Sequence, residues 1–95
     1  MLTSKQRAHL RGLASVQDTI FQIGKGGLTE QLMQQVAAAL KARELIKLRV
    51  LPNADVTPHE AAAAVGEATG AETVCVIGSR FVLYKRNDKK PVIKL

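Results

Sequence analysis

The sequence has little cysteine and few aromatic residues, and each shortage excludes a class of protein. Because Cys75 is the single cysteine, the chain cannot be a disulfide-bonded scaffold. With no Trp, one Tyr and two Phe, the stacking of bases on aromatic rings cannot be its main mode of binding. No apolar run approaches the roughly 18–20 residues of a membrane-spanning helix, and residues 1–7 lack the apolar centre of a signal peptide. We therefore expect a soluble cytoplasmic protein without a membrane partner.

Positive charge is abundant but unevenly distributed. The 95 residues, of which 46% are hydrophobic, suffice for one domain with one modest core, and the formal net charge of +6 favours a polyanionic partner. Residues 1–50 contain eight Lys or Arg and three Asp or Glu, residues 51–79 contain four acids and no Lys or Arg, and residues 80–95 contain six bases and one acid. An anion-binding surface is therefore expected to come from the two ends of the sequence, unless the pattern is only a solvated surface.

Three segments carry the signals of helices. Residues 3–6 have the spacing of a capping box, which predicts a helix over residues 4–14. An apolar residue recurs every fourth position after Thr29, a natural N-cap, and predicts a second helix that ends at about residue 43. Residues 57–60 read Thr-Pro-His-Glu, a strong helix start, and Gly70 is expected to end that third helix.

Four segments are expected to be strands. Residues 19–23 are β-branched and aromatic, and residues 45–51 alternate between apolar and basic side chains, which predicts a half-buried strand. Residues 73–77 are apolar on both faces and predict an interior strand. Gly78-Ser79 predicts a tight hairpin turn into a last strand over residues 80–84. The polar, basic tail from about residue 85 to residue 95 is expected to fray.

The order α-β-α-β-α-β-β predicts an α/β fold: a single compact domain with a small four-stranded mixed sheet and helices mainly on one face. The first three strands should run parallel and the final hairpin antiparallel. Their carboxyl ends would share one edge, where ligands of open α/β sheets bind. This edge would bring together residues 24–27, Arg49 and Arg80, and the first turns of the first helix, with Lys5 and Arg7, are expected to rise toward it.

A glycine-rich loop, Gly24-Lys25-Gly26-Gly27, stands immediately before a helix start. Glycines let the backbone approach a phosphate, the helix start offers unpaired N–H groups, and Lys25 adds a full charge. The loop is not a Walker loop, and it lacks the last glycine of the dinucleotide-binding pattern. The pattern that remains, G-x-x-G, clamps nucleic-acid backbone in KH modules. The alternative is an ordinary strand-to-helix turn.

Four segments together resemble the bacterial YhbY family, whose members are stand-alone CRM domains, named for chloroplast RNA splicing and ribosome maturation. The segments are residues 3–7, 22–30, 42–47 and 76–84, and they span nearly the whole chain in order. The resemblance implies one RNA-binding domain over residues 1–95, with a fold related to the C-terminal domain of bacterial initiation factor three. It also implies association with ribosomal RNA in precursors of the large ribosomal subunit, and it maps the family's G-x-x-G loop onto the glycine loop.

We therefore expect a monomeric, non-enzymatic RNA-binding protein with no cofactor, metal or small-molecule substrate. Two alternatives remain: a protein that binds a nucleotide or another phosphoryl ligand through the same loop, and an adaptor for an acidic protein partner. An enzyme is disfavoured because no general base, nucleophile or cluster of metal ligands accompanies the loop. The residues expected to contact RNA are Gly24, Lys25, Gly26, Gly27, Lys5, Arg7, Arg11, Lys47, Arg49 and Arg80.

Overall fold

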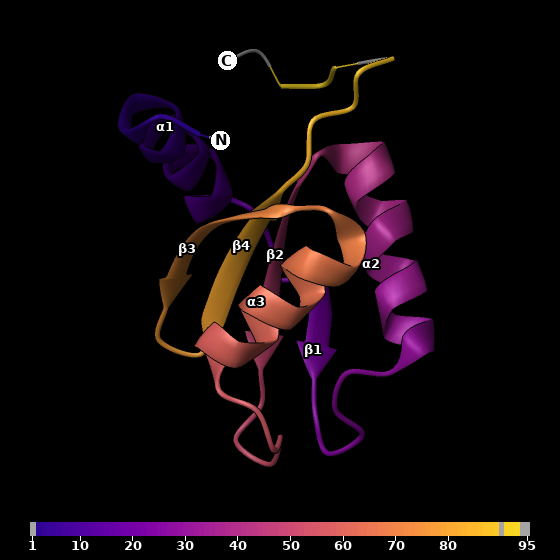
Figure 1. Ribbon diagram of the computed structural model, residues 1–95. Coiled ribbons are helices and arrows are strands. Elements are labelled where there is room, and N and C mark those ends of the chain that lie inside the picture. Colours follow the sequence, from indigo (N-terminus) through magenta and orange to yellow (C-terminus); the bar gives the residue numbers. More distant parts are fainter. Residues whose placement is uncertain (1, 90, 94–95) are drawn as a thin grey trace.

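Three helices and four strands follow one another in the predicted order α-β-α-β-α-β-β in the computed structural model, which describes residues 2–89 and 91–93 (Figure 1). Each predicted helix is found with its ends displaced by no more than one residue, and the first strand is two residues shorter than predicted. None of the helices within the described residues is long and apolar enough to cross a membrane. The elements are α1 (Ser4–Ser15), β1 (Phe21–Ile23), α2 (Glu30–Arg43), β2 (Leu45–Val50), α3 (Pro58–Thr69), β3 (Glu72–Ile77) and β4 (Arg80–Tyr84).

The predicted capping residues start the helices. At α1, the Thr3 hydroxyl accepts from the Gln6 N–H at 3.1 Å, and the Gln6 side chain accepts from the Thr3 N–H at 3.0 Å. The same reciprocal pair starts α3, and Thr29 caps α2 by accepting from the Leu32 N–H at 3.0 Å. Gly70, at φ +75°, ends α3 in the left-handed conformation that glycine adopts without strain. These local bonds satisfy N–H groups that would otherwise lack partners at the helix starts.

The four strands form one mixed sheet in the order β1-β2-β4-β3. β1 and β2 are parallel, whereas β4 is antiparallel to both β2 and β3. The first three strands therefore run in one direction, and the final hairpin is antiparallel, as predicted. The prediction that residues 73–77 form an interior strand is wrong, because β3 lies at the edge of the sheet. Its apolar side chains on both faces are explained by helices over both faces of the sheet.

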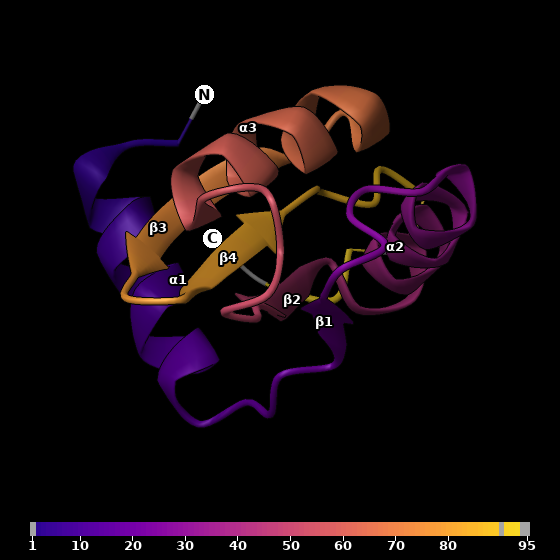
Figure 2. The ribbon, with the colours of Figure 1, turned by 90° about the horizontal axis from the view of Figure 1, so that it is seen from below.

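Helices cover the two faces of the sheet unequally. α2 and α3 lie on one face and α1 on the other, so most of the helical cover is on one face, as predicted (Figure 2). On the side of α2 and α3, the main core contains Leu48, Phe81 and Leu83. On the other side, Leu10 and Ala14 of α1 pack against a smaller cluster that includes Leu45, Val74, Val82 and Tyr84. β2 contributes side chains to both cores, and this pattern explains why it is buried on both sides.

Glu44, between α2 and β2, anchors the tail that the sequence predicts to fray. Its side chain is fully buried, and its φ is +64°. The carboxylate accepts N–H groups from Asn87 at 2.6 Å, Val92 at 2.7 Å and Ile93 at 2.6 Å, while the Glu44 carbonyl accepts the Lys85 N–H at 2.9 Å. A buried charge requires such partners. The expectation of a frayed tail is therefore wrong for its described part; residues 90, 94 and 95 lie outside the described residues.

These hydrogen bonds make the stability of the fold depend on pH. Burial alone would raise the pKa of Glu44, but the three backbone N–H groups and the charge of Arg86 lower it below its ordinary value. A carboxyl whose pKa is lower in the folded state stabilises that state above its unfolded pKa, and this stabilisation is lost as the pH falls through the folded pKa.

Replacement of Glu44 by glutamine should lower the free energy of unfolding at pH 7 by about 1–3 kcal/mol, because a neutral amide oxygen is a weaker acceptor for the tail. The deficit should shrink in acid, where the native carboxyl is also protonated. Urea unfolding of the wild type and the variant, at pH 7 and at an acidic pH below the folded pKa of Glu44, measures the two deficits. Glu67→Gln, at an exposed carboxyl on α3, is the matched control and should change stability by less than about 0.5 kcal/mol. An equal Glu44→Gln deficit at both pH values would contradict the role of the charge.

Candidate nucleic-acid interface

The glycine loop is a tight turn that joins β1 to α2. The Gly27 N–H donates to the Gly24 carbonyl at 2.9 Å, so Lys25 and Gly26 occupy the central positions of a β-turn. Gly27 has φ +70°, whereas Gly26 does not have a positive φ. A Cβ atom at either position would meet no atom within 4 Å, and Lys25 is exposed. The outer surface of the loop is therefore open to a ligand.

Backbone hydrogen bonds fix this loop at one edge of the sheet. The Leu51 N–H donates to the Ile23 carbonyl at 2.8 Å, and the Val50 N–H donates to the Ser79 carbonyl at 2.7 Å. The glycine loop, the end of β2 and the β3–β4 turn therefore meet at the lower end of the molecule in Figure 1. This arrangement confirms the predicted shared edge and the placement of Arg49 and Arg80 near the loop.

A row of side chains crosses all four strands beside the loop. Gln22 is paired with Arg49, Arg49 with Arg80, and Arg80 with Ile77. Because the neighbouring Phe81 points into the main core, the alternation of a strand places the row on the other face. Ile77 is 65% exposed, Gln22 and Arg80 are exposed, and the buried Nε of the half-buried Arg49 has no hydrogen-bond partner. We call Gln22, Arg49, Ile77 and Arg80 the open sheet face.

Two further predicted residues flank the open sheet face. Lys47 lies two residues before Arg49 on β2, and its Nζ donates to the Gln17 carbonyl at 3.3 Å. Arg11 is exposed on α1. Burial raises the pKa of the Cys75 thiol, and the charges of Arg11, Lys47 and Arg7 oppose that increase. Cys75 and Lys47 are both paired with Val82 of β4. The sheet thus brings together three of the predicted basic side chains, Lys47, Arg49 and Arg80, and Arg11 is exposed on the helix that packs on the same face.

The structure separates Lys5 and Arg7 from this surface. The Arg7 guanidinium forms an ion pair with Glu72 at 3.3 Å, and Glu72 is paired with Tyr84 at the end of the sheet opposite the glycine loop. The expectation that the first turns of α1 rise toward the loop edge is therefore wrong. Contact between RNA and Lys5 or Arg7 stays a prediction that rests on the sequence alone.

The packing of α1 explains this difference. Leu10 and Ala14 are buried against the sheet, which fixes the direction of the helix across it. Arg7 then reaches β3, where it donates to the carbonyls of Thr73 and Val74, the latter at 2.9 Å. The pairing of β3 with β4 shifts register at this point. Arg7 thus satisfies carbonyl groups at an irregular sheet edge, which is a structural role.

Neutral amide side chains, which the sequence analysis did not single out, surround the loop. A shallow hollow of about 350 Å³ lies between the loop and the start of α2. The spacing of Gln31 and Gln35, which lie one turn apart on α2 directly after the loop, is the feature of the sequence that could have predicted these amides. None of the described residues that line the hollow is charged, so they offer hydrogen bonds rather than charge. Its lining residues are Gln22, Gly24, Gly26, Gly27, Thr29, Gln31, Leu32 and Gln35.

Groups of three or more His, Cys, Asp or Glu side chains that could hold a metal ion do not occur in residues 2–89 and 91–93. His9 on α1 and His59 on α3 are both exposed, on elements that cover opposite faces of the sheet. Within this part of the chain, the chemistry of the site consists of backbone N–H groups, amides and cations.

Comparisons with known proteins identify the family and support the fold. The model of the CRS1 / YhbY (CRM) domain family matches residues 2–85. The chain is 41% identical over 95 residues to "Probable RNA-binding protein YqeI" of Bacillus subtilis, covering 100% of this chain and 99% of the relative. It is 32% identical over 91 residues to an "RNA-binding protein" of Haemophilus influenzae, and the match covers 96% of this chain and 92% of that relative. The solution structure of the hypothetical protein SAV1595 from Staphylococcus aureus matches with a TM-score of 0.82 and 46% identity, and the match covers 100% of this chain and 99% of that protein.

The geometry of the loop predicts different costs for two neighbouring substitutions. Gly27→Ala should lower the free energy of unfolding by about 1–2 kcal/mol, because a side chain is strained in the left-handed region. Gly26→Ala should change it by less than about 0.5 kcal/mol, because neither backbone conformation nor space opposes a Cβ atom there. Thermal and urea unfolding measure both. Equal destabilisation by the two variants would contradict the turn described here.

Proposed function

The chain belongs to the CRS1/YhbY (CRM) domain family, and from this membership we propose that it binds RNA through the glycine loop and the open sheet face without catalysing a reaction. Two relatives that match almost the whole chain are named as RNA-binding proteins. The single observation that carries the proposal is that the glycine loop, whose outer surface is open, lies beside Arg49 and Arg80, which are paired across β2 and β4. We further propose that residues 1–95 act as one monomeric domain in the cytoplasm, on ribosomal RNA in large-subunit precursors.

The glycine loop suits a phosphate group of the RNA backbone. Its glycines expose the main chain, and the start of α2 contributes partial positive charge. Lys25 supplies a full charge at the centre of the turn. Glu30, the acid at the start of α2, does not line the hollow beside the loop. A phosphate would thus meet backbone N–H groups and one lysine.

The open sheet face extends this positive surface. Arg49 and Arg80 are directly opposite each other, and like charges in that position destabilise a sheet. A bound polyanion would relieve the repulsion. With few aromatic residues for stacking, phosphate contacts must provide most of the affinity. Gln22, Gln31 and Gln35 would add hydrogen bonds to sugars or bases and hence modest selectivity.

The two alternative functions fit the surface less well. A free nucleotide would need charge around one enclosed pocket, whereas the hollow beside the loop is shallow and its lining side chains are uncharged. An acidic protein partner would be attracted to the same arginines, but it would not explain a loop that exposes its backbone. Competition between RNA and either ligand separates these possibilities.

Lys25→Ala and Arg49→Ala should each weaken RNA binding, for all RNA sequences alike, because each removes one phosphate contact. If about five phosphates are neutralised, the slope of log K against log salt should be about −3.5 for single-stranded RNA, and each variant should reduce its magnitude by about 0.7. Fluorescence anisotropy at several salt concentrations measures both quantities. The salt slope is measured with a single-stranded RNA of about six nucleotides, which has about five internucleotide phosphates, and the affinity for one site is measured with an RNA tetranucleotide. Four nucleotides is the length of backbone that a G-x-x-G loop clamps in KH modules.

Lys41→Ala is the matched control, because it removes an exposed charge at the other end of α2. It should leave the affinity for the tetranucleotide unchanged. Unchanged affinity in Lys25→Ala and Arg49→Ala, with native melting temperatures, would contradict the proposal and leave the loop as a simple turn. Displacement of the RNA by a free nucleotide would favour the phosphoryl-ligand alternative.

A further inference from the structure

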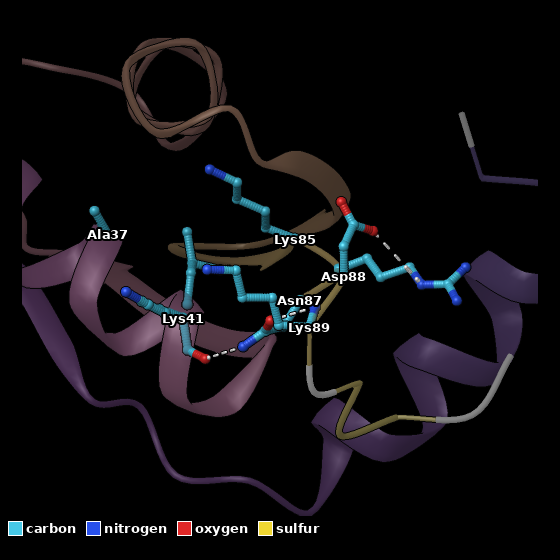
Figure 3. A pocket seen from close by; sticks show the side chains of 8 residues that line it. Ala37, Lys41, Lys85, Asn87, Asp88 and Lys89 are labelled. Atoms are coloured by element: carbon cyan, nitrogen blue, oxygen red, sulfur yellow. Dashed lines mark hydrogen bonds and ion pairs between the residues drawn. The ribbon is translucent and has the colours of Figure 1, made fainter.

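A second cationic site lies at the end of the sheet opposite the glycine loop. There the docked tail and the last turns of α2 enclose a partly open cavity of about 440 Å³. Figure 3 shows Lys41, Lys85 and Lys89 extending toward the same side of this cavity, close to Ala37. We call it the lysine cavity. Its lining residues are Ala37, Leu40, Lys41, Lys85, Arg86, Asn87, Asp88 and Lys89.

Two of the lysines carry charge that no acid in the described part of the chain neutralises. Asp88, the one acid among the described residues that line the cavity, has a carboxylate oxygen 4.0 Å from the Arg86 Nε. The Nζ of Lys85 donates to the Thr69 carbonyl at 2.8 Å and so helps to close the end of α3. Lys41 and Lys89 are exposed and form no salt bridge within residues 2–89 and 91–93. They remain available to an anion.

The fold holds these cations in place rather than leaving them on a loose tail. The Asn87 side-chain amide donates to the Lys41 carbonyl at 3.0 Å, and its oxygen accepts the Lys89 N–H at 3.1 Å. The Glu44 carboxylate accepts the Asn87 N–H at 2.6 Å. Bringing like charges together costs free energy, which a bound anion would recover, and a site built in advance loses less entropy on binding.

We propose that the lysine cavity binds a second segment of RNA backbone while the glycine loop and the open sheet face bind the first. This inference rests on the proposed function. The phosphate of this segment would meet the Lys41 and Lys89 ammonium groups, and a sugar would lie against the exposed Ala37. The six residues of β2 separate the two sites by about 20 Å. Such a protein binds two backbone segments of a folded RNA rather than one short strand.

The double variant Lys41→Gln/Lys89→Gln tests the second site. Arg43→Gln is the matched control for Lys41→Gln alone, because each variant removes one exposed charge from the last turn of α2 and Arg43 does not line the lysine cavity. Two probes are used: the RNA tetranucleotide, which is too short for both sites, and a fragment of large-subunit ribosomal RNA. The double variant should bind the tetranucleotide as the wild type does and the fragment on the order of tenfold more weakly, with the magnitude of the salt slope reduced by about 1.4.

Three results would overturn the second site. The double variant could bind the fragment as the wild type does, or it could lose as much affinity for the tetranucleotide as for the fragment. Arg43→Gln could also weaken binding to the fragment as much as Lys41→Gln does, which would reflect net charge alone. Failure of the proposed function would give a different result. The wild type would then bind neither the tetranucleotide nor the fragment, or Lys25→Ala would bind both RNAs as tightly as the wild type does. Melting temperatures of the double variant, Lys41→Gln and Arg43→Gln establish that each is folded.

Discussion

The register of β2 is the constraint on which the rest of the structure depends. This strand lies between β1 and β4, and its side chains enter two different cores, Leu48 under α2 and α3 and Leu45 under α1. A slip by one residue would turn Lys47 and Arg49 into the main core and leucines toward solvent, so burial on both faces fixes the pairing. The same register places Arg49 between its partners on β1 and β4 and holds the glycine loop at the adjoining edge.

The packing also separates charge across the molecule. Much of the acidic middle segment of the sequence forms α3, whose exposed Glu60 and Glu67 lie on the side of the sheet away from the open sheet face. Asp55, in the loop after β2, is the acid of this segment that lies near the glycine-loop edge. The basic ends of the chain provide the open sheet face and the lysine cavity. An RNA that approaches the molecule is therefore attracted to particular faces rather than to its whole surface.

Features that depend on neighbouring residues could be predicted from the sequence, whereas features that depend on distant contacts could not. Helix caps, apolar periodicity, strand-forming composition and the Gly78-Ser79 turn located the helices and strands. The common direction of three strands predicted that Arg49, Arg80 and the glycine loop share an edge. The direction of α1 escaped prediction because it depends on how Leu10 packs on a sheet formed by later residues. The docked tail escaped because Glu44 and its partners lie 43–49 residues apart.

The central claim is that RNA contacts the glycine loop and the open sheet face. Ultraviolet crosslinking of the protein to RNA in cell extract, followed by identification of both the crosslinked peptides and the attached RNA, tests it most directly. We expect crosslinks in the peptides that contain residues 24–27, Arg49 and Arg80, joined to large-subunit ribosomal RNA. Crosslinks confined to α3, with none at the glycine loop or the open sheet face, would contradict the account.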